Sequence, residues 1–202
     1  DWTYFLVLIG AALSLWASAG VKSKFSQYSK VLTMRGITAY DAAERILHDA
    51  GIYDVRIERV AGNLTDHYDP RTNVIRLSDN VYNSTSVAAI GVACHEAGHA
   101  AQYAEHYSPI KIRNNILPLA NIGSRLGFPI AIIGYFLDFG PLAIACAVFF
   151  SFAVLFQLAT LPVEFNASRR AVDVISQTNI LSEDEIIGTK KVLSAAAMTY
   201  VA

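Results

Sequence analysis

The sequence predicts a mainly α-helical, integral membrane protein with several spans, in which a small α+β domain is inserted between the first span and a transmembrane hairpin. Of its 202 residues, 53% are hydrophobic and only 16% are charged, a balance that is unusual for a soluble chain. Two long stretches carry no charge, and a segment of soluble character lies between them. We therefore expect an anchor at residues 1–21, a folded domain at 22–113 and a helical hairpin at 114–163.

The first uncharged run covers residues 2–21, which is about the 20 residues that a helix needs to cross a hydrocarbon core. A secretory signal peptide is the alternative, because Ala17-Ser18-Ala19 resembles a cleavage site. Signal peptides begin with positive charge, however, and this run begins with Asp1. A retained anchor is the better interpretation.

The hairpin is predicted from a second uncharged run at residues 139–163. The apolar stretch before it, 126–137, is too short to cross a membrane alone. A transmembrane helix here must also include the more polar residues 114–125. Asp138-Phe139-Gly140-Pro141 is typical of the turn between the two helices. Residues 164–191 then return to soluble character, and residues 192–202 are expected to begin a further span or an interfacial helix.

Charge placement predicts the orientation, since Lys and Arg near spans favour the cytoplasmic side. All the basic residues next to the predicted spans fall on one side, and only Asp1 and Asp138 are left for the other. The basic residues are Lys22, Lys24, Lys30, Arg35, Lys111, Arg113, Arg169, Arg170, Lys190 and Lys191. The domain should therefore face the cytoplasm. A net charge of −1 gives no reason to propose a nucleic-acid partner.

The inserted domain shows alternating helix and strand patterns. Thr38 can cap a helix that Gly51 ends, and the next two apolar segments alternate as half-buried strands do. The expected elements are, in order, a helix at 38–50, a strand at 53–60, a polar turn at 66–71, a strand at 73–78 and a long helix at 84–106.

The long helix carries His95-Glu96-Ala97-Gly98-His99. Histidines four residues apart lie on one face of a helix, one turn from each other, where both can bind a single Zn²⁺. Glu96 is offset around the axis and can reach a water at the metal without being a ligand. This arrangement is typical of zinc peptidases.

A catalytic zinc site usually takes three protein ligands, so the sequence must supply another. The extended motif with a third histidine is excluded, because position 105 is Glu105 and position 102 is Gln102 rather than glycine. The alternative is a glutamate from a later helix. Glu164, where the hairpin ends on the side of the domain, is the outstanding candidate.

Three segments carry a resemblance to a known family: residues 64–70 (Leu-Thr-Asp-His-Tyr-Asp-Pro), the His-Glu-Ala-Gly-His helix, and residues 161–171 (Leu-Pro-Val-Glu-Phe-Asn-Ala-Ser-Arg-Arg-Ala). Together they resemble the YugP-like family of bacterial membrane neutral zinc metallopeptidases, over nearly the whole chain. The resemblance implies one Zn²⁺ per chain held by His95, His99 and Glu164, with Glu96 as general base. It also implies the bacterial inner (plasma) membrane as the location.

One position departs from the related gluzincin pattern. Those peptidases place an aspartate four residues after the ligand glutamate, whereas this chain has Ser168. Support for a ligating histidine must then come from another group, with Asn166 as a candidate, so Asn166 and Ser168 are expected beside the ligands.

The implied activity is hydrolysis of peptide bonds in membrane-associated or juxtamembrane protein segments. His67, Tyr68 and Arg169 are candidates to stabilise the oxyanion or contact the substrate. For His67 and Tyr68 the competing and favoured interpretation is packing on the turn. The competing hypothesis is a catalytically silent, metal-binding membrane scaffold or regulator. A secreted zinc protein with a cleaved leader is disfavoured by the hairpin. A homo-oligomer or a membrane-protein partner stays open.

Overall fold

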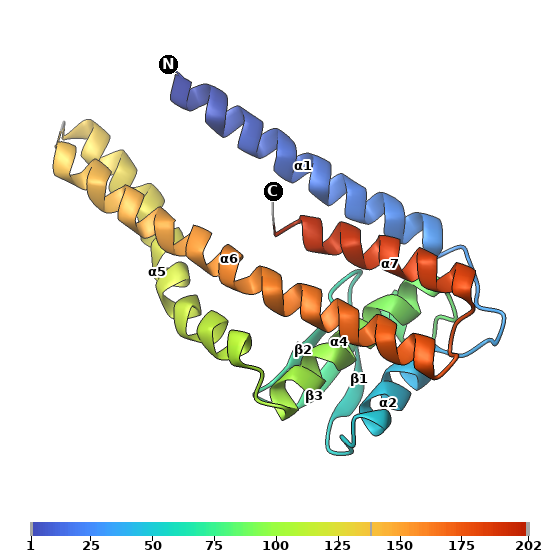
Figure 1. Ribbon diagram of the computed structural model, residues 1–202. Coiled ribbons are helices and arrows are strands. Elements are labelled where there is room, and N and C mark those ends of the chain that lie inside the picture. Colours follow the sequence, from blue (N-terminus) through green and yellow to red (C-terminus); the bar gives the residue numbers. More distant parts are fainter. Residues whose placement is uncertain (1, 138, 201–202) are drawn as a thin grey trace. The chain divides into compact units, whose positions relative to one another are not determined.

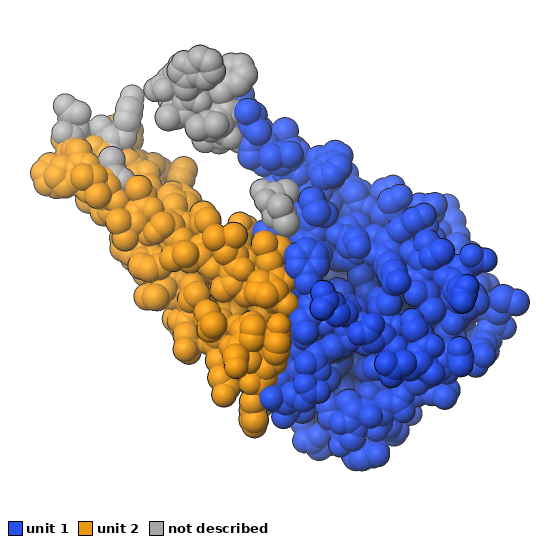
Figure 2. Space-filling model, in the orientation of Figure 1, with its two compact units in different colours: residues 1–105, 164–202 blue, residues 106–163 orange. Residues whose placement is uncertain are grey.

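The computed structural model describes residues 2–137 and 139–200. They form two compact units, one of residues 1–105 and 164–202 and the other of residues 106–163 (Figure 2). The elements, labelled in Figure 1, are α1 (Trp2–Tyr28), α2 (Ala39–Asp49), β1 (Arg56–Val60), β2 (His67–Asp69), β3 (Val74–Ser78), α3 (Asp79–Tyr82), α4 (Val87–Ala104), α5 (Ser108–Phe136), α6 (Gly140–Gln177) and α7 (Glu183–Met198).

The larger unit contains a three-stranded sheet with the order β1-β3-β2. β1 is parallel to β3, whereas β2 is antiparallel to it and pairs Tyr68 with Ile75. The central strand β3 buries Val74, Ile75 and Leu77 completely. Two of the three strands lie where the alternating pattern predicted them.

The third strand, β2, corrects the prediction of a simple polar turn at residues 66–71. Asp66, just before the strand, accepts hydrogen bonds from the backbone N–H of Ser78 at 2.7 Å and from its hydroxyl at 3.1 Å. These bonds hold the start of β2 against the end of β3. The short strand therefore depends on a tertiary contact that local patterning does not reveal.

Helix α2 begins and ends as the sequence predicted. Thr38 and Asp41 form a reciprocal capping box, and Gly51 follows the helix with a φ of +71°. The buried face of α2 packs on α4. It thereby closes one side of the core around the metal-motif helix.

Helix α4 is the centre of the larger unit and contacts α2, α7, β2 and β3. Ser86 caps its N-terminus by accepting from the N–H of Ala89 at 3.2 Å. Its buried positions are mostly small residues, which allow close neighbours. A Cβ on Gly91, for example, would lie 2.9 Å from the Thr189 methyl group on α7.

Helices α1 and α7 run side by side in the larger unit (Figure 1). Of the predicted anchor at residues 1–21, residues 2–21 lie in α1, where Leu8, Leu15 and Trp16 are exposed. Residues 192–202, predicted to begin a span or an interfacial helix, lie largely in α7, which buries Val192 and Leu193. Both membrane assignments stay predictions.

The smaller unit is a helical hairpin made of α5 and the first part of α6. The helices come close at Gly123, where a Cβ would clash with the carbonyl oxygen of Phe149. By length and composition, Ser108–Gly134 and Gly140–Gln177 could each cross a membrane. In the described part of the second, no residue of the most apolar stretch is buried. A core helix of a soluble protein would be buried there.

The hairpin differs from the prediction in its bounds. Its first helix begins at Ser108 rather than at 114, and α6 continues past Pro162 and Glu164 to Gln177. The expected turn includes Asp138, which lies outside the described residues. Because α6 is continuous, Glu164 is the first residue that this helix contributes to the larger unit.

Candidate metal centre

Three side chains from two helices meet in the larger unit. His95 and His99 stand one turn apart on α4, with ring centroids 4.6 Å from each other, and Glu164 reaches them from α6. Glu164 Oε2 lies 3.2 Å from His95 Nε2 and 3.6 Å from His99 Nε2. One possible ligand atom from each of the three residues lies within 4.8 Å of the other two.

The spacing of these donor atoms suits a zinc ion. A tetrahedral site with bonds of about 2.0–2.2 Å has ligand atoms roughly 3.3–3.6 Å apart. The two separations from Glu164 Oε2, 3.2 and 3.6 Å, lie within or just below this range. Two imidazole nitrogens and one carboxylate oxygen are also a donor set that leaves a fourth position for water or substrate.

Gly98 explains how the two helices come close enough. A Cβ at this position would lie only 2.7 Å from the backbone carbonyl oxygen of Ala167 on α6. Glycine therefore lets α4 pack directly on the α6 backbone, three residues beyond Glu164. The small residue between the two histidines is part of the geometry of the site.

Glu96 is buried beside the three ligand candidates. Its Oε2 accepts a hydrogen bond from the backbone N–H of Tyr68 at 2.9 Å, so strand β2 fixes the orientation of the carboxylate. The charge of Glu96 also acts on the His99 ring. Strand β2, which the sequence did not predict, is thus the element that holds Glu96.

The other ring nitrogen of each histidine has its own partner. Ser168 Oγ lies 3.1 Å from His95 Nδ1, and Gln102 Oε1 lies 3.0 Å from His99 Nδ1. Asn166 does not contact a histidine in any described bond; its Oδ1 accepts from Gln102 Nε2 at 2.9 Å. Both nitrogens that face Glu164 are therefore the Nε2 atoms, and hydrogen bonds at the Nδ1 atoms orient the two rings, as is usual for histidines that bind a metal.

Gln102 is the site residue that sequence reasoning missed. In the sequence it is notable only because the extended motif has glycine at this position. In the structure it lies one turn after His99 on the same helix face and is completely buried. That spacing was the available signal. A buried amide three residues after a metal-ligating histidine has to find hydrogen-bond partners nearby.

The electrostatics of the cluster favour positive charge near the histidines. Burial lowers the pKa of His99, but the nearby carboxylates of Glu164 and Glu96 outweigh it, so the pKa is raised. Burial also raises the pKa of Asp66, with a smaller contribution from Glu96. Cys94, adjacent to His95, is buried and has a raised thiol pKa, which is typical of a packing residue.

The three predicted oxyanion or substrate contacts lie apart from the ligand contacts described. His67 is exposed, and its Nδ1 lies 2.8 Å from the carbonyl oxygen of Thr65. The hydroxyl of Tyr68 donates to Asn73 Oδ1 at 2.7 Å, and its backbone N–H donates to Glu96 Oε2. Arg169 is exposed and lines a cavity of about 460 Å³ between α6 and α7, which also includes Ser168. Their proposed roles stay predictions.

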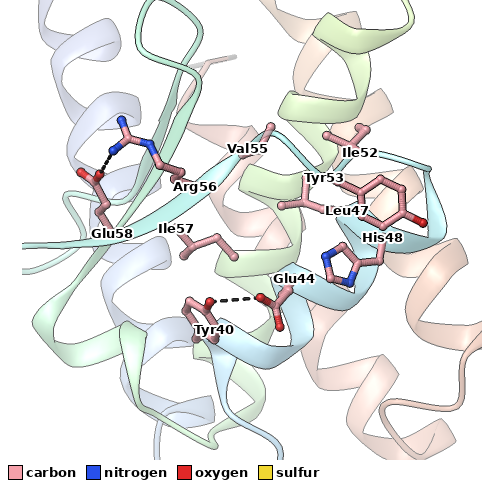
Figure 3. A pocket seen from close by; sticks show the side chains of 10 residues that line it. All are labelled: Tyr40, Glu44, Leu47, His48, Ile52, Tyr53, Val55, Arg56, Ile57 and Glu58. Atoms are coloured by element: carbon pink, nitrogen blue, oxygen red, sulfur yellow. Dashed lines mark hydrogen bonds and ion pairs between the residues drawn. The ribbon is translucent and has the colours of Figure 1, made fainter.

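A second cavity, of about 380 Å³, lies between α2 and β1 (Figure 3). Four of its polar side chains are paired: Tyr40 donates to Glu44 at 3.1 Å, and Arg56 forms an ion pair with Glu58 at 3.1 Å. None of the three ligand candidates lines it. The chemistry is therefore concentrated at α4 and α6.

These features are typical of a class of protein: they form a candidate metal centre of two histidines and one glutamate on packed helices, with a buried glutamate beside it. Comparison with known proteins agrees with this class. Residues 3–202 match the family described as "Putative neutral zinc metallopeptidase", and the chain belongs to that family. The chain is also 47% identical over 198 residues to "Putative membrane protease YugP" of Bacillus subtilis strain 168, covering 98% of this chain and 88% of that protein. No solved structure matches the chain significantly.

Proposed function

We propose that this protein is a membrane-embedded zinc endopeptidase that hydrolyses peptide bonds in membrane-associated or juxtamembrane protein segments. The observation that carries the proposal is the meeting of His95, His99 and Glu164 beside the oriented carboxylate of Glu96. Family membership and the relative named a membrane protease support it. The substrate class follows from the apolar hairpin, which would keep the site at the membrane surface.

His95 Nε2, His99 Nε2 and Glu164 Oε2 would hold the zinc ion. When bound, zinc supplies Lewis acidity that polarises the scissile carbonyl and acidifies water. Glu96 acts as general base and then as general acid, taking the proton from the attacking water and returning it to the leaving amine. The Tyr68 N–H holds Glu96 Oε2, which leaves Oε1 as the oxygen we assign to proton transfer.

Membrane insertion is supported by the exposed apolar surface of the hairpin. Large hydrophobic side chains such as Phe128, Ile144 and Leu158 are 65%, 70% and 59% exposed. Soluble monomers rarely expose large apolar patches, so exposed apolar side chains along both helices of the hairpin favour a lipid environment. With the basic residues on the same side as the metal motif, the proposed site faces the cytoplasm of a bacterial cell.

A silent metal-binding scaffold is the second candidate, and Glu96 argues against it. A structural zinc site needs no buried carboxylate beside its ligands, because burying a charge costs free energy without stabilising the metal. In this protein strand β2 provides a backbone donor to hold that carboxylate. A buried and oriented Glu96 carboxylate is expected if this group accepts and returns a proton during hydrolysis.

The Glu96→Gln variant tests the proposal. The glutamine oxygen can still accept from Tyr68, so we expect unchanged zinc content and thermal stability but cleavage of labelled casein lowered at least about 100-fold, as for loss of a general base. Glu44→Gln, a change on α2, should cleave at the wild-type rate. Equal cleavage by wild type and Glu96→Gln would overturn the catalytic role of Glu96.

A further inference from the structure

A chain of polar side chains extends away from His99 into the contact between α4 and α6. Gln102 Oε1 lies at His99 Nδ1, Gln102 Nε2 donates to Asn166 Oδ1, and Arg170 Nε donates to the same Asn166 oxygen at 2.7 Å. Arg170 in turn forms an ion pair with Glu105 at 2.8 Å. We infer that Gln102 and Asn166 are positioning residues that set the tautomer of His99, an inference that rests on the proposed metal site.

The donor and acceptor at each hydrogen bond in this series of side chains are fixed by the chemistry of the groups. The Arg170 guanidinium can only donate, so the atom of Asn166 that it meets must be the oxygen. That oxygen then requires the NH₂ group of Gln102, which turns the Gln102 oxygen toward His99. An amide oxygen only accepts, so His99 Nδ1 must carry the proton.

A proton on Nδ1 leaves Nε2 as the atom that a metal can occupy, once the proton that the nearby Glu164 carboxylate attracts to Nε2 has left. Nε2 is the atom that lies 3.6 Å from Glu164 Oε2, within the candidate ligand group. The wrong tautomer would present an N–H to the metal position and would have to rearrange before binding. The chain therefore prepares His99 for a metal before the metal arrives.

Burial of Gln102 prevents its amide from turning over. Gln102 is completely buried, so neither end of its amide can exchange protein partners for bulk water. The outer end of the chain is closer to solvent, with the side chains of Arg170 and Glu105 27% and 57% exposed. The hydrogen bond and charge of Arg170 lower the pKa of Glu105, so its carboxylate is charged at neutral pH and can pair with Arg170. Arg170 near the surface thus fixes the orientation of the Asn166 amide, which in turn fixes that of the Gln102 amide.

The matched variants Asn166→Asp and Asn166→Leu test the inference, because residue 166 contacts none of the ligands in the bonds described. A carboxylate can still accept from both Gln102 and Arg170, whereas leucine cannot accept and leaves the Gln102 amide able to turn over. Gln102→Met, which removes the acceptor itself, is the second variant. All are made in the full chain in detergent.

Two measurements separate positioning from folding. Nitrogen-15 NMR of the metal-free protein at pH 9, with His99 assigned through His99→Gln, should show the Nδ1–H tautomer in wild type and Asn166→Asp and a mixture in the other two. Zinc competition with a chelating dye should give near wild-type affinity for Asn166→Asp and about 10- to 100-fold weaker affinity for Asn166→Leu and Gln102→Met.

Asn166→Leu and Asn166→Asp with the same tautomer and the same zinc affinity would overturn the inference. Wild type that binds no zinc would instead overturn the proposed metal site. The NMR comparison would still test the tautomer in that case, since it is made without metal. The two failures are therefore distinguishable.

Discussion

Ser168 lies beside His95 at the position where the sequence resemblance predicts a supporting group, and it offers a hydroxyl rather than a carboxylate. Its hydroxyl lies 3.1 Å from His95 Nδ1 and can accept the ring N–H. A hydroxyl adds no negative charge to a cluster that already holds Glu96 and Glu164. The two histidines thus have different supports, a hydroxyl for His95 and an amide for His99.

Asp69 provides a prediction on pH, because it stabilises the strand that holds Glu96. Hydrogen bonds from the Thr72 hydroxyl, the Arg71 N–H and Arg76 lower the pKa of Asp69 to about 2. An unfolded aspartate has a pKa of about 3.9, so the contribution of Asp69 is complete well above pH 4 and is lost as pH falls toward 2. Asp69→Asn should lack this contribution.

Thermal unfolding midpoints measured from pH 6 to pH 2 check the prediction. Wild type should be more stable than Asp69→Asn at pH 6, and the difference should shrink between about pH 4 and pH 2. A difference that stays constant down to pH 2 would show that the ionised carboxylate is not the source of the stabilisation.

At the scale of elements, the site depends on the close packing of α4 against α6 at Gly98. Alanine there would gain up to about 1 kcal/mol of helix propensity, but its Cβ would lie 2.7 Å from the Ala167 carbonyl oxygen. Overpacking typically costs about 1–3 kcal/mol, and a backbone atom cannot rotate away. The helices would have to separate and move Glu164 from the histidines.

We therefore expect Gly98→Ala to lower both the thermal unfolding midpoint and the zinc content. Gly20→Ala on α1 is the control, since a Cβ there meets nothing within 4 Å and should be neutral or slightly stabilising. Calorimetry and elemental analysis measure the two effects. Gly98→Ala with wild-type stability and zinc would contradict the packing argument.

The elements that the sequence predicted are those whose signals are local. The capping box of α2 and the spacing of His95 and His99 on α4 lie within single helices. Strand β2 was missed because three residues become a strand only through pairing with β3. The bond between Gln102 and Asn166 joins residues 64 positions apart, so only folding reveals it.

Helix α6 shows a second limit of sequence reasoning. Hydropathy indicates where an apolar run ends, near Val163, but a helix can continue beyond it. α6 does so to Gln177 although Pro162 lacks an N–H for the helix. Continuity matters for function because it places Glu164 on a helix that both units share.

At the scale of the whole molecule, the proposed topology places the hairpin turn outside the cell and the metal centre inside. Single cysteines can test it in a background with Cys94→Ser and Cys146→Ser. In intact bacterial cells, a membrane-impermeant maleimide should label Phe139→Cys at the turn but should label Lys190→Cys only after permeabilisation. Both positions are exposed in the structure. Labelling of both from the same side would contradict a spanning hairpin.

The central claim is that His95, His99 and Glu164 hold one zinc ion, and zinc analysis of purified wild type and Glu164→Ala tests it most directly. Wild type should contain about one zinc per chain. Glu164→Ala should lose most of it while keeping its helical circular dichroism, because two histidines alone leave a catalytic zinc site incomplete. Equal zinc in the two proteins, or none in freshly prepared wild type, would contradict the claim.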